Sequence, residues 1–268
     1  MNATSSAVSR PPISPNLSHA FGGVWRLTVR RCLLPGHWLI VAGLVALLAL
    51  VTTATVHQPR VSERFFTWTS GFYLSFLIPL FAFVSAGGTL RDELKPGSVD
   101  YIFTRPIPRS AFVVFKFIAH LACVQLDFLV ALAALAAVGV YRGVPGILAA
   151  MPLLFLGQFL ALLAFSAFGF LCGIFTSRYV IVGLIYGAVI EVGLGQIPTA
   201  LNQLAMTHQV KLIVKPLLTM TTLVDGLPAG QSELMGAAVL AIFSTVALGV
   251  AALIFSSREL AGASSRDT

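Results

Sequence analysis

The chain has 268 residues, of which 57% are hydrophobic and 10% charged, and its formal net charge is +7. A soluble protein is typically about 45–50% apolar and about 25% charged, so this composition excludes an ordinary soluble domain and indicates a membrane protein. Its basic balance is explained by Lys and Arg on the cytoplasmic side of a membrane and gives no reason to expect nucleic-acid binding. The three cysteines are widely spaced beside or within apolar stretches, which favours packing roles over disulfides or a zinc site.

The first segments are polar or amphipathic. Residues 1–17 are rich in Ser, Pro and Asn and are expected to form a disordered tail. Residues 18–34 predict an amphipathic helix, because apolar side chains fall on one helical face while Arg26 and Arg30 fall roughly opposite. With Trp25 at headgroup depth, this helix suits the cytoplasmic membrane interface. It is either a simple anchor or a platform that also touches a partner protein.

Six apolar runs follow, each about long enough, at about 20 residues, to cross a bilayer core as a helix. They cover about residues 38–56, 66–86, 111–140, 147–175, 179–197 and 234–255, within a transmembrane domain of residues 35–260 and before a short C-terminal tail, 261–268. The predicted fold class is therefore an all-α integral membrane protein. Residues 198–233 are too apolar for a free loop and predict an outer re-entrant helical segment.

The distribution of basic residues predicts the orientation. If both termini are cytoplasmic, the cytoplasmic segments contain twelve of the 17 Lys and Arg residues and the opposite side contains five. Because basic residues accumulate on the cytoplasmic side, both termini are expected there, in agreement with an even number of spans.

Residues 89–110, between the second and third spans, carry the most information about function. They read as a charged helical extension, a break at Pro96-Gly97, a short helix and a second break at Pro106. The short helix displays apolar side chains that must be buried either against the N-terminal helix or against a docking partner. The candidate docking residues of this loop are Glu93, Gly97, Val99, Tyr101, Ile102, Phe103, Arg105, Pro106 and Arg109.

The order of an acidic residue (Glu93), Gly97, a Pro- and Arg-containing stretch (Arg105–Arg109) and Lys116 resembles permeases of type-2 ATP-binding-cassette (ABC) exporters. The layout of the chain is similar as well, although the sequence-specific likeness is confined to about residues 88–116. The resemblance implies that the loop is a coupling helix that sits in a cleft of a separate cytoplasmic ATPase subunit. It also implies that ATP and Mg²⁺ are bound by that partner, that two permease copies form the pathway, and that the location is the bacterial inner membrane.

The absence of a phosphate-binding loop agrees with a separate ATPase. A Walker A loop needs a Gly before its Lys, so that backbone amides and the Lys together bind phosphates. None of the four lysines in this chain follows a Gly. We therefore expect this chain to be non-catalytic, with no cofactor of its own.

Two ionisable residues lie inside predicted spans, Asp127 in the third and Glu191 in the fifth. A charge at a helix centre costs about 2.5–3.5 kcal/mol on insertion scales, so each side chain is expected to face protein or water. Each either belongs to the translocation pathway, as a contact, proton site or gate, or joins helices through Gln125, Gln158, His120 or a second copy. We name Asp127, Gln158 and Glu191 as candidates for the pathway or its gate.

Three other classes of protein are alternatives to a permease. An ion- or proton-coupled transporter that uses Asp127 and Glu191 would show broken helices in matching halves of the chain. An intramembrane enzyme is disfavoured because the sequence has no His-Glu-x-x-His pattern. A non-transporting anchor for a cytoplasmic ATPase would have much the same sequence as a permease, so only a transport assay separates the two.

Overall fold

A computed structural model describes residues 17–55, 61–93, 108–193, 200–218 and 232–264. This part of the chain is built from helices and contains no strand, as the all-α prediction requires. Five of its helices are long and apolar enough to cross a membrane. They are α2 (Pro35–Thr55), the continuous helix α3–η1–α4 (Val61–Glu93), α6 (Arg109–Tyr141), α7 (Ile147–Phe175) and α11 (Glu233–Ser264).

The fifth predicted span, 179–197, is helical over residues 179–193, the part that the structure describes. It begins with α8 (Tyr179–Tyr186) and continues as a π-helical segment, η2 (Gly187–Gly193). Its apolar part ends at Glu191, so this helix is shorter than the five of spanning length. The predicted end of the span falls at 194–197, outside the described residues. The described residues thus show five helices of spanning length, against the six that were predicted.

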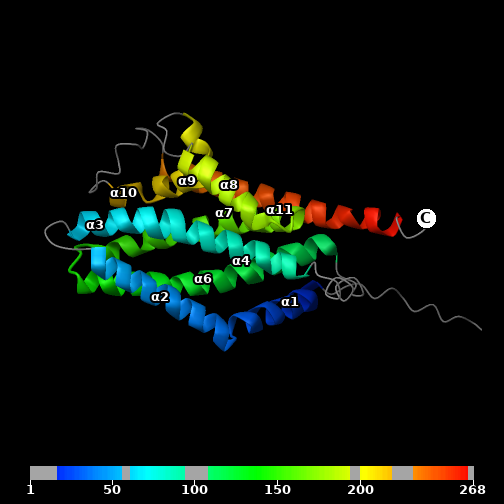
Figure 1. Cartoon of the computed structure of the whole chain (residues 1–268), viewed down its shortest axis with the longest axis horizontal. Helices are drawn as coiled ribbons and strands as arrows, with labels where there is room; N and C mark the ends of the chain where they lie inside the picture. Colours follow the sequence, from blue (N-terminus) through cyan, green and yellow to red (C-terminus); the bar gives the residue numbers. More distant parts are fainter. Residues whose placement is uncertain (1–16, 56–60, 94–107, 194–199, 219–231, 265–268) are drawn as a thin grey trace, which may run out of the picture.

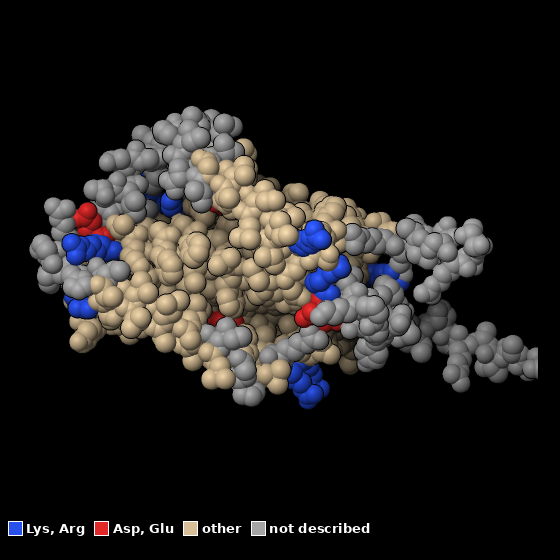
Figure 2. All heavy atoms as spheres, in the orientation of Figure 1, with Lys and Arg blue, Asp and Glu red and all other residues tan. Residues whose placement is uncertain are grey.

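The long helices lie roughly side by side, with α1 (Leu17–Cys32) and α2 meeting in an elbow along one side and α8 on the opposite side (Figure 1). Charged side chains gather towards the two ends of the face shown in Figure 2, and the band between them is almost entirely uncharged. This distribution is that of a protein whose middle is surrounded by hydrocarbon. The coupling helix predicted between the second and third spans lies outside the described residues.

The closest helix packing joins α4 (Ile78–Glu93) to α7. A Cβ atom added to Gly169 would lie 2.5 Å from the carbonyl oxygen of Phe83, and one added to Gly173 would lie 2.8 Å from that of Gly87. No side chain fits at such distances, so the two backbones touch directly, as small residues permit between membrane helices. This pair forms the most tightly packed part of the described bundle.

The second span contains a π-helical segment, η1 (Thr69–Leu77), between α3 (Val61–Trp68) and α4. Its Tyr73 is fully buried and donates a hydrogen bond to the Gln158 side chain at 2.6 Å. Tyr73 also reaches the carbonyl oxygen of Phe128 at 3.2 Å. One hydroxyl therefore joins three long helices, at a type of segment that often marks functional sites in helices.

The N-terminal helix α1 is present where an amphipathic helix was predicted, and it packs against the first half of α6. Its Phe21 ring lies edge-on to Phe115 of α6 at 5.3 Å between centroids, and Thr28 is buried. The placement of α1 in a membrane interface stays a prediction. What the structure shows is that α1 is attached to a spanning helix along its apolar face.

The outer segment, predicted as re-entrant over 198–233, is helical where it is described. It contains the 3₁₀ turn η4 (Ala200–Leu204), α9 (Met206–Ile213) and α10 (Lys215–Leu218). A Cβ atom on Gly236 of α11 would lie 2.7 Å from the Gln209 carbonyl oxygen, so α9 rests directly on α11. This contact shows that the segment is folded onto the bundle, while its depth in a membrane stays a prediction.

Candidate functional site

The predicted docking loop is described only at its two ends. Glu93 is the last residue of α4 and Arg109 the first of α6. The other candidate docking residues lie outside the described residues: Gly97, Val99, Tyr101, Ile102, Phe103, Arg105 and Pro106. The structure therefore bears on the two helices that flank the loop, α4 and α6.

Glu93 and Lys116 form a buried ion pair between these two helices. The Lys116 Nζ atom lies 2.8 Å from Glu93 Oε1, with 1% of the lysine side chain and 10% of the glutamate side chain exposed. A charge-assisted hydrogen bond in such a dry place is short and strong because water does not compete for it. Glu93 was predicted as a docking residue, and its carboxylate is instead turned towards α6.

A second polar contact lies one turn away on the same two helices. The Thr89 hydroxyl and His120 Nδ1 are 3.3 Å apart. The buried His120 ring also lies 5.7 Å from the Phe170 ring of α7, centroid to centroid. These two polar contacts thus join the ends of α4 and α6 that flank residues 94–107, and His120 also packs on α7.

The predicted interfacial residues lie beside this region on α1. The Trp25 ring is partly exposed and packs 5.7 Å from the Phe21 ring, which in turn contacts α6. Arg26 and Arg30 are both exposed. The helix therefore has an apolar face on α6 and presents Arg26 and Arg30 outward, as the sequence pattern indicated.

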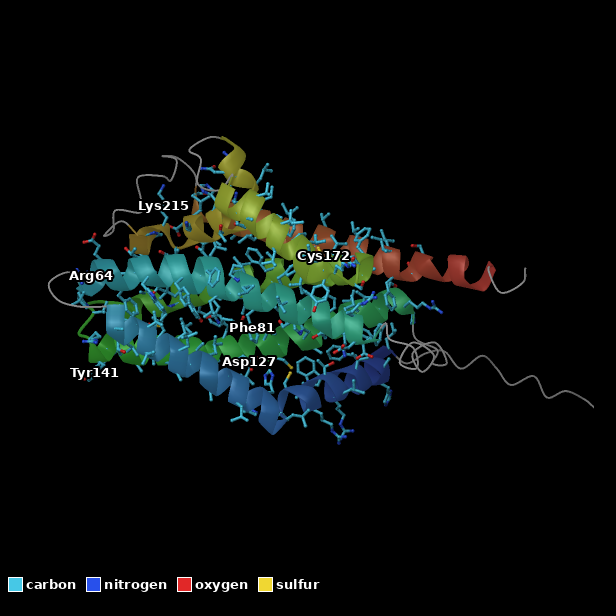
Figure 3. All side chains as sticks on the ribbon, viewed as in Figure 1. Arg64, Phe81, Asp127, Tyr141, Cys172 and Lys215 are labelled. Atoms are coloured by element: carbon cyan, nitrogen blue, oxygen red, sulfur yellow. The ribbon has the colours of Figure 1, made fainter. Side chains whose placement is uncertain are left out.

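Asp127 is buried and pairs with a residue that the sequence did not suggest. His37 Nε2 lies 3.0 Å from Asp127 Oδ1, and the second carboxylate oxygen, Oδ2, has no hydrogen-bond partner in the described part of the chain. Figure 3 shows Asp127 on the side of the bundle that carries α1 and α2. Of the partners expected from the sequence, Gln158 and His120 bond elsewhere. His37, at the start of α2, could have been suspected as a histidine beside an apolar run.

Glu191 holds the beginning of α9. Its carboxylate accepts hydrogen bonds from the Tyr186 hydroxyl at 2.8 Å and from the backbone N–H groups of Met206 at 3.0 Å and Thr207 at 3.1 Å, and also from the Thr207 hydroxyl. A carboxylate at the first amides of a helix satisfies donors that have no partner within the helix. Burial lowers the pKa of nearby Lys211, and the negative charge of Glu191 opposes that shift.

A family model described as ABC-2 family transporter protein matches residues 8–260. The chain belongs to the ABC-2 family of transporter proteins. A comparison with curated proteins gave no match. Together with the five spanning helices, the family identifies a multi-pass membrane protein of the transport machinery, and it agrees with the resemblance carried by residues 88–116.

Within this ABC-2 protein the three pathway candidates have separate partners. Asp127 joins α6 to α2, Gln158 of α7 bonds to Tyr73 of η1, and Glu191 bonds to α9. Each contact joins two elements of the same chain, which is what polar residues between membrane helices commonly do. Across the described residues, no group of three or more His, Cys, Asp or Glu side chains is arranged to hold a metal ion.

Proposed function

We propose that this ABC-2 family protein is the permease subunit of an ABC transporter, in which two permease copies form the translocation pathway. Separate cytoplasmic ATPase subunits, which bind ATP and Mg²⁺, dock on the loop 89–110 and drive the transporter. The observation that carries this proposal is the double link between the helices on either side of the loop, Glu93 with Lys116 and Thr89 with His120.

The links matter because a coupling segment must pass a movement on to the spanning helices. If α4 and α6 were free of each other near the loop, a push on residues 94–107 would be absorbed by local bending. With a buried ion pair and a second contact one turn deeper, both helices move together. The tight contact between α4 and α7 at Gly169 then carries the movement into the centre of the bundle.

The proposed orientation places both termini in the cytoplasm of a bacterial inner membrane. It rests on the twelve basic residues on the side of residues 89–110 against five on the other side. In this orientation α1 lies on the same side as the loop, next to the first turns of α6. A movement of α6 would then displace α1 as well.

The test is a purification of the tagged full-length chain from its native membrane. We expect a chain with a Walker A sequence, identified by mass spectrometry, and ATP hydrolysis in the same fraction. Phe103→Asp in the loop should abolish both, because a charge replaces an apolar docking side chain. Tyr141→Asp is the matched control, since Tyr141 is an exposed aromatic residue at the opposite end of the bundle (Figure 3).

Two outcomes would count against the proposal. If no ATPase is recovered with the intact chain, the proposed role as an ABC permease subunit is contradicted. Equal recovery with the intact chain and with Phe103→Asp would move the docking site away from the loop. Charge reversal at Glu93 is not a suitable probe of docking, because it would first break the buried pair with Lys116.

An ion-coupled transporter remains the main alternative class, and it makes a different demand on Asp127 and Glu191. Such a mechanism needs acidic groups that share a site at broken helices. The second and fifth spans do contain π-helical segments, η1 and η2. However, Asp127 is paired with His37 and Glu191 with the start of α9, so the geometry favours linking roles for both. A non-transporting anchor would pass the purification test and fail a transport assay.

A further inference from the structure

The N-terminal arm, defined as α1 and α2 together, runs alongside α6 and bends at the elbow between its two helices (Figure 1). An α-helix rises about 1.5 Å per residue, so positions on α6 serve as a scale of depth for the arm beside it. Three contacts fix the alignment of the arm with α6: Arg142 with the Thr53 carbonyl oxygen, Asp127 with His37, and Phe115 with Phe21.

This scale places the elbow between α1 and α2 at one edge of the hydrocarbon core. Arg142 ends α6 on one side and is suited to a membrane boundary. A core about 30 Å thick corresponds to about 20 residues of helix, which leads from Arg142 to the neighbourhood of Cys123. Cys123 interacts with Cys32, the last residue of α1. The second boundary therefore falls at the elbow that follows Cys32.

The same scale places the two exposed arginines of α1 in the headgroup layer. Arg30 and Arg26 precede the elbow by about one and two helical turns, so they lie at most about 5 and 10 Å beyond it in depth. The headgroup region on each side of a bilayer is about 5–8 Å thick. Both guanidinium groups thus lie at, or within one turn of, the depth of lipid phosphates.

The surface of the arm changes character at this boundary. Leu33 and Leu34, at the elbow, are 60% and 56% exposed, and Leu27 on α1 is 49% exposed. Arg26 and Arg30 are one turn apart on the adjoining outer face of α1. Among the described residues, neither arginine has a carboxylate partner. Exposed leucines beside two unpaired guanidinium groups match the acyl chains and the phosphate of one lipid molecule.

We propose that Arg26 and Arg30 bind the phosphate of an anionic phospholipid whose acyl chains cover Leu27 and Leu34. Guanidinium groups bind phosphate oxygens through paired hydrogen bonds, which favours Arg in this role. A headgroup with net negative charge is preferred over a zwitterionic one, whose ammonium group the two arginines repel. This site is independent of the proposed ATPase docking and of the orientation of the chain.

The location of the site gives it a consequence for the transporter. α1 packs on α6 through Phe21, close to the ends of α4 and α6 that are linked by Lys116. A lipid bound at Arg26 and Arg30 ties this side of the arm to the membrane surface. Lipid composition would then set how freely α6 moves relative to the bilayer.

The test uses fluorescence of Trp25 in a full-length variant that keeps it as the sole tryptophan, Trp38→Phe with Trp68→Phe. The protein is reconstituted in phosphatidylcholine vesicles with a minor fraction of phosphatidylglycerol, and bromine quencher is placed on the chains of one lipid or the other. We expect brominated phosphatidylglycerol to quench Trp25 beyond its mole fraction. This excess should fall about fivefold for each Arg→Gln change at positions 26 and 30, and it should fall with added salt.

Matched variants separate binding from general charge and from misfolding. Arg64→Gln removes an exposed arginine at the opposite end of the bundle and should leave the excess unchanged (Figure 3). Arg26→Lys with Arg30→Lys keeps both charges and should retain most of it. Quenching in proportion to mole fraction for both lipids would overturn the proposal. Absence of quenching by either lipid would also overturn it, because α1 would then lie away from the bilayer.

Discussion

Two polar contacts of α6 in the described part of the chain, Lys116 with Glu93 and Asp127 with His37, differ in what surrounds them. Lys116 and Glu93 are both buried and join α6 to α4, which belongs to a long helix whose most apolar stretch is 56% buried. His37 is 23% exposed and joins Asp127 of α6 to α2, whose most apolar stretch is only 18% buried. α6 therefore lies between a packed core, made with α4 and α7, and the more lightly attached N-terminal arm.

This difference in burial indicates which parts of the molecule are expected to move relative to each other. In the core, backbones touch at Gly169, and the ends of α4 and α6 are linked twice. The arm has much of its surface exposed to the surroundings and is tied to α6 by few polar contacts. A rigid core and a lightly attached arm are the parts that a lever needs.

The largest effect is expected from Lys116→Met. Removing the lysine leaves the Glu93 carboxylate buried without this cation, and breaking a buried pair in this way costs about 3–5 kcal/mol. We expect a large fall in the apparent melting temperature of the purified chain. The measurement is the amount of folded protein that size-exclusion chromatography recovers after heating to a series of temperatures. Exchanging the two residues, Lys116→Glu with Glu93→Lys, should recover most of the loss. A variant with the same melting temperature as the wild type would show that this pair does not stabilise the core.

A slightly smaller effect is expected from Gly169→Leu. The new side chain would begin 2.5 Å from the Phe83 carbonyl oxygen, and overpacking of this kind typically costs about 1–3 kcal/mol. The control is Gly43→Leu on α2, where a Cβ atom meets nothing within 4 Å. The comparison between core and arm predicts a lowered melting temperature for the first variant and almost none for the second. Equal losses at both positions would contradict it.

Glu191→Gln tests a third contact, outside both regions. An amide offers one acceptor oxygen where the carboxylate offers two, so either the Met206 or the Thr207 N–H group faces another donor. An unsatisfied buried donor costs about 1–3 kcal/mol, and the loss is confined to α9 and its neighbours. We expect faster amide hydrogen exchange in residues 206–213, with exchange in α4 unchanged. Unaltered exchange in α9 would mean that Glu191 does not hold this helix.

Much of the bundle could be predicted because hydropathy reports directly on contact with lipid. The span predicted at 147–175 agrees with α7 residue by residue. It is preceded by Gly146 in a left-handed conformation, with φ 71°, which ends the preceding turn. The span predicted at 66–86 is longer in the structure, Val61–Glu93, because helices continue past the hydrocarbon where charged residues can be solvated. Hydropathy marks the part of a helix inside the core and misses the rest.

The contacts within the site could not be predicted in the same way. Both Asp127 and Glu191 were identified as polar residues that need partners, but the partner of Asp127 lies 90 residues away in the sequence. Which residue faces Asp127 depends on the depth of the elbow, and no local pattern records that depth. The fifth predicted span is described as far as Gly193, and its apolar run gave no sign that Glu191 bonds to the start of α9.

The smallest effect is expected from Asp127→Asn, and this variant sharpens the contrast between the two polar contacts of α6. The amide oxygen can still accept a hydrogen bond from His37, and the second oxygen, replaced by an NH₂ group, has no described partner to lose. We therefore expect a change of less than about 1 kcal/mol in stability, compared with about 3–5 kcal/mol for Lys116→Met. The measurement is the melting temperature of both variants, prepared side by side.

A pair that holds only a lightly attached arm should also tolerate the loss of its other member. His37→Gln keeps a donor for Asp127 and should resemble Asp127→Asn in stability. If Asp127→Asn instead destabilised the chain as strongly as Lys116→Met, the arm would belong to the rigid core. If it left stability unchanged but abolished ATP hydrolysis by the purified complex, the charge of Asp127 would have a part in the transport cycle that a linking role does not explain.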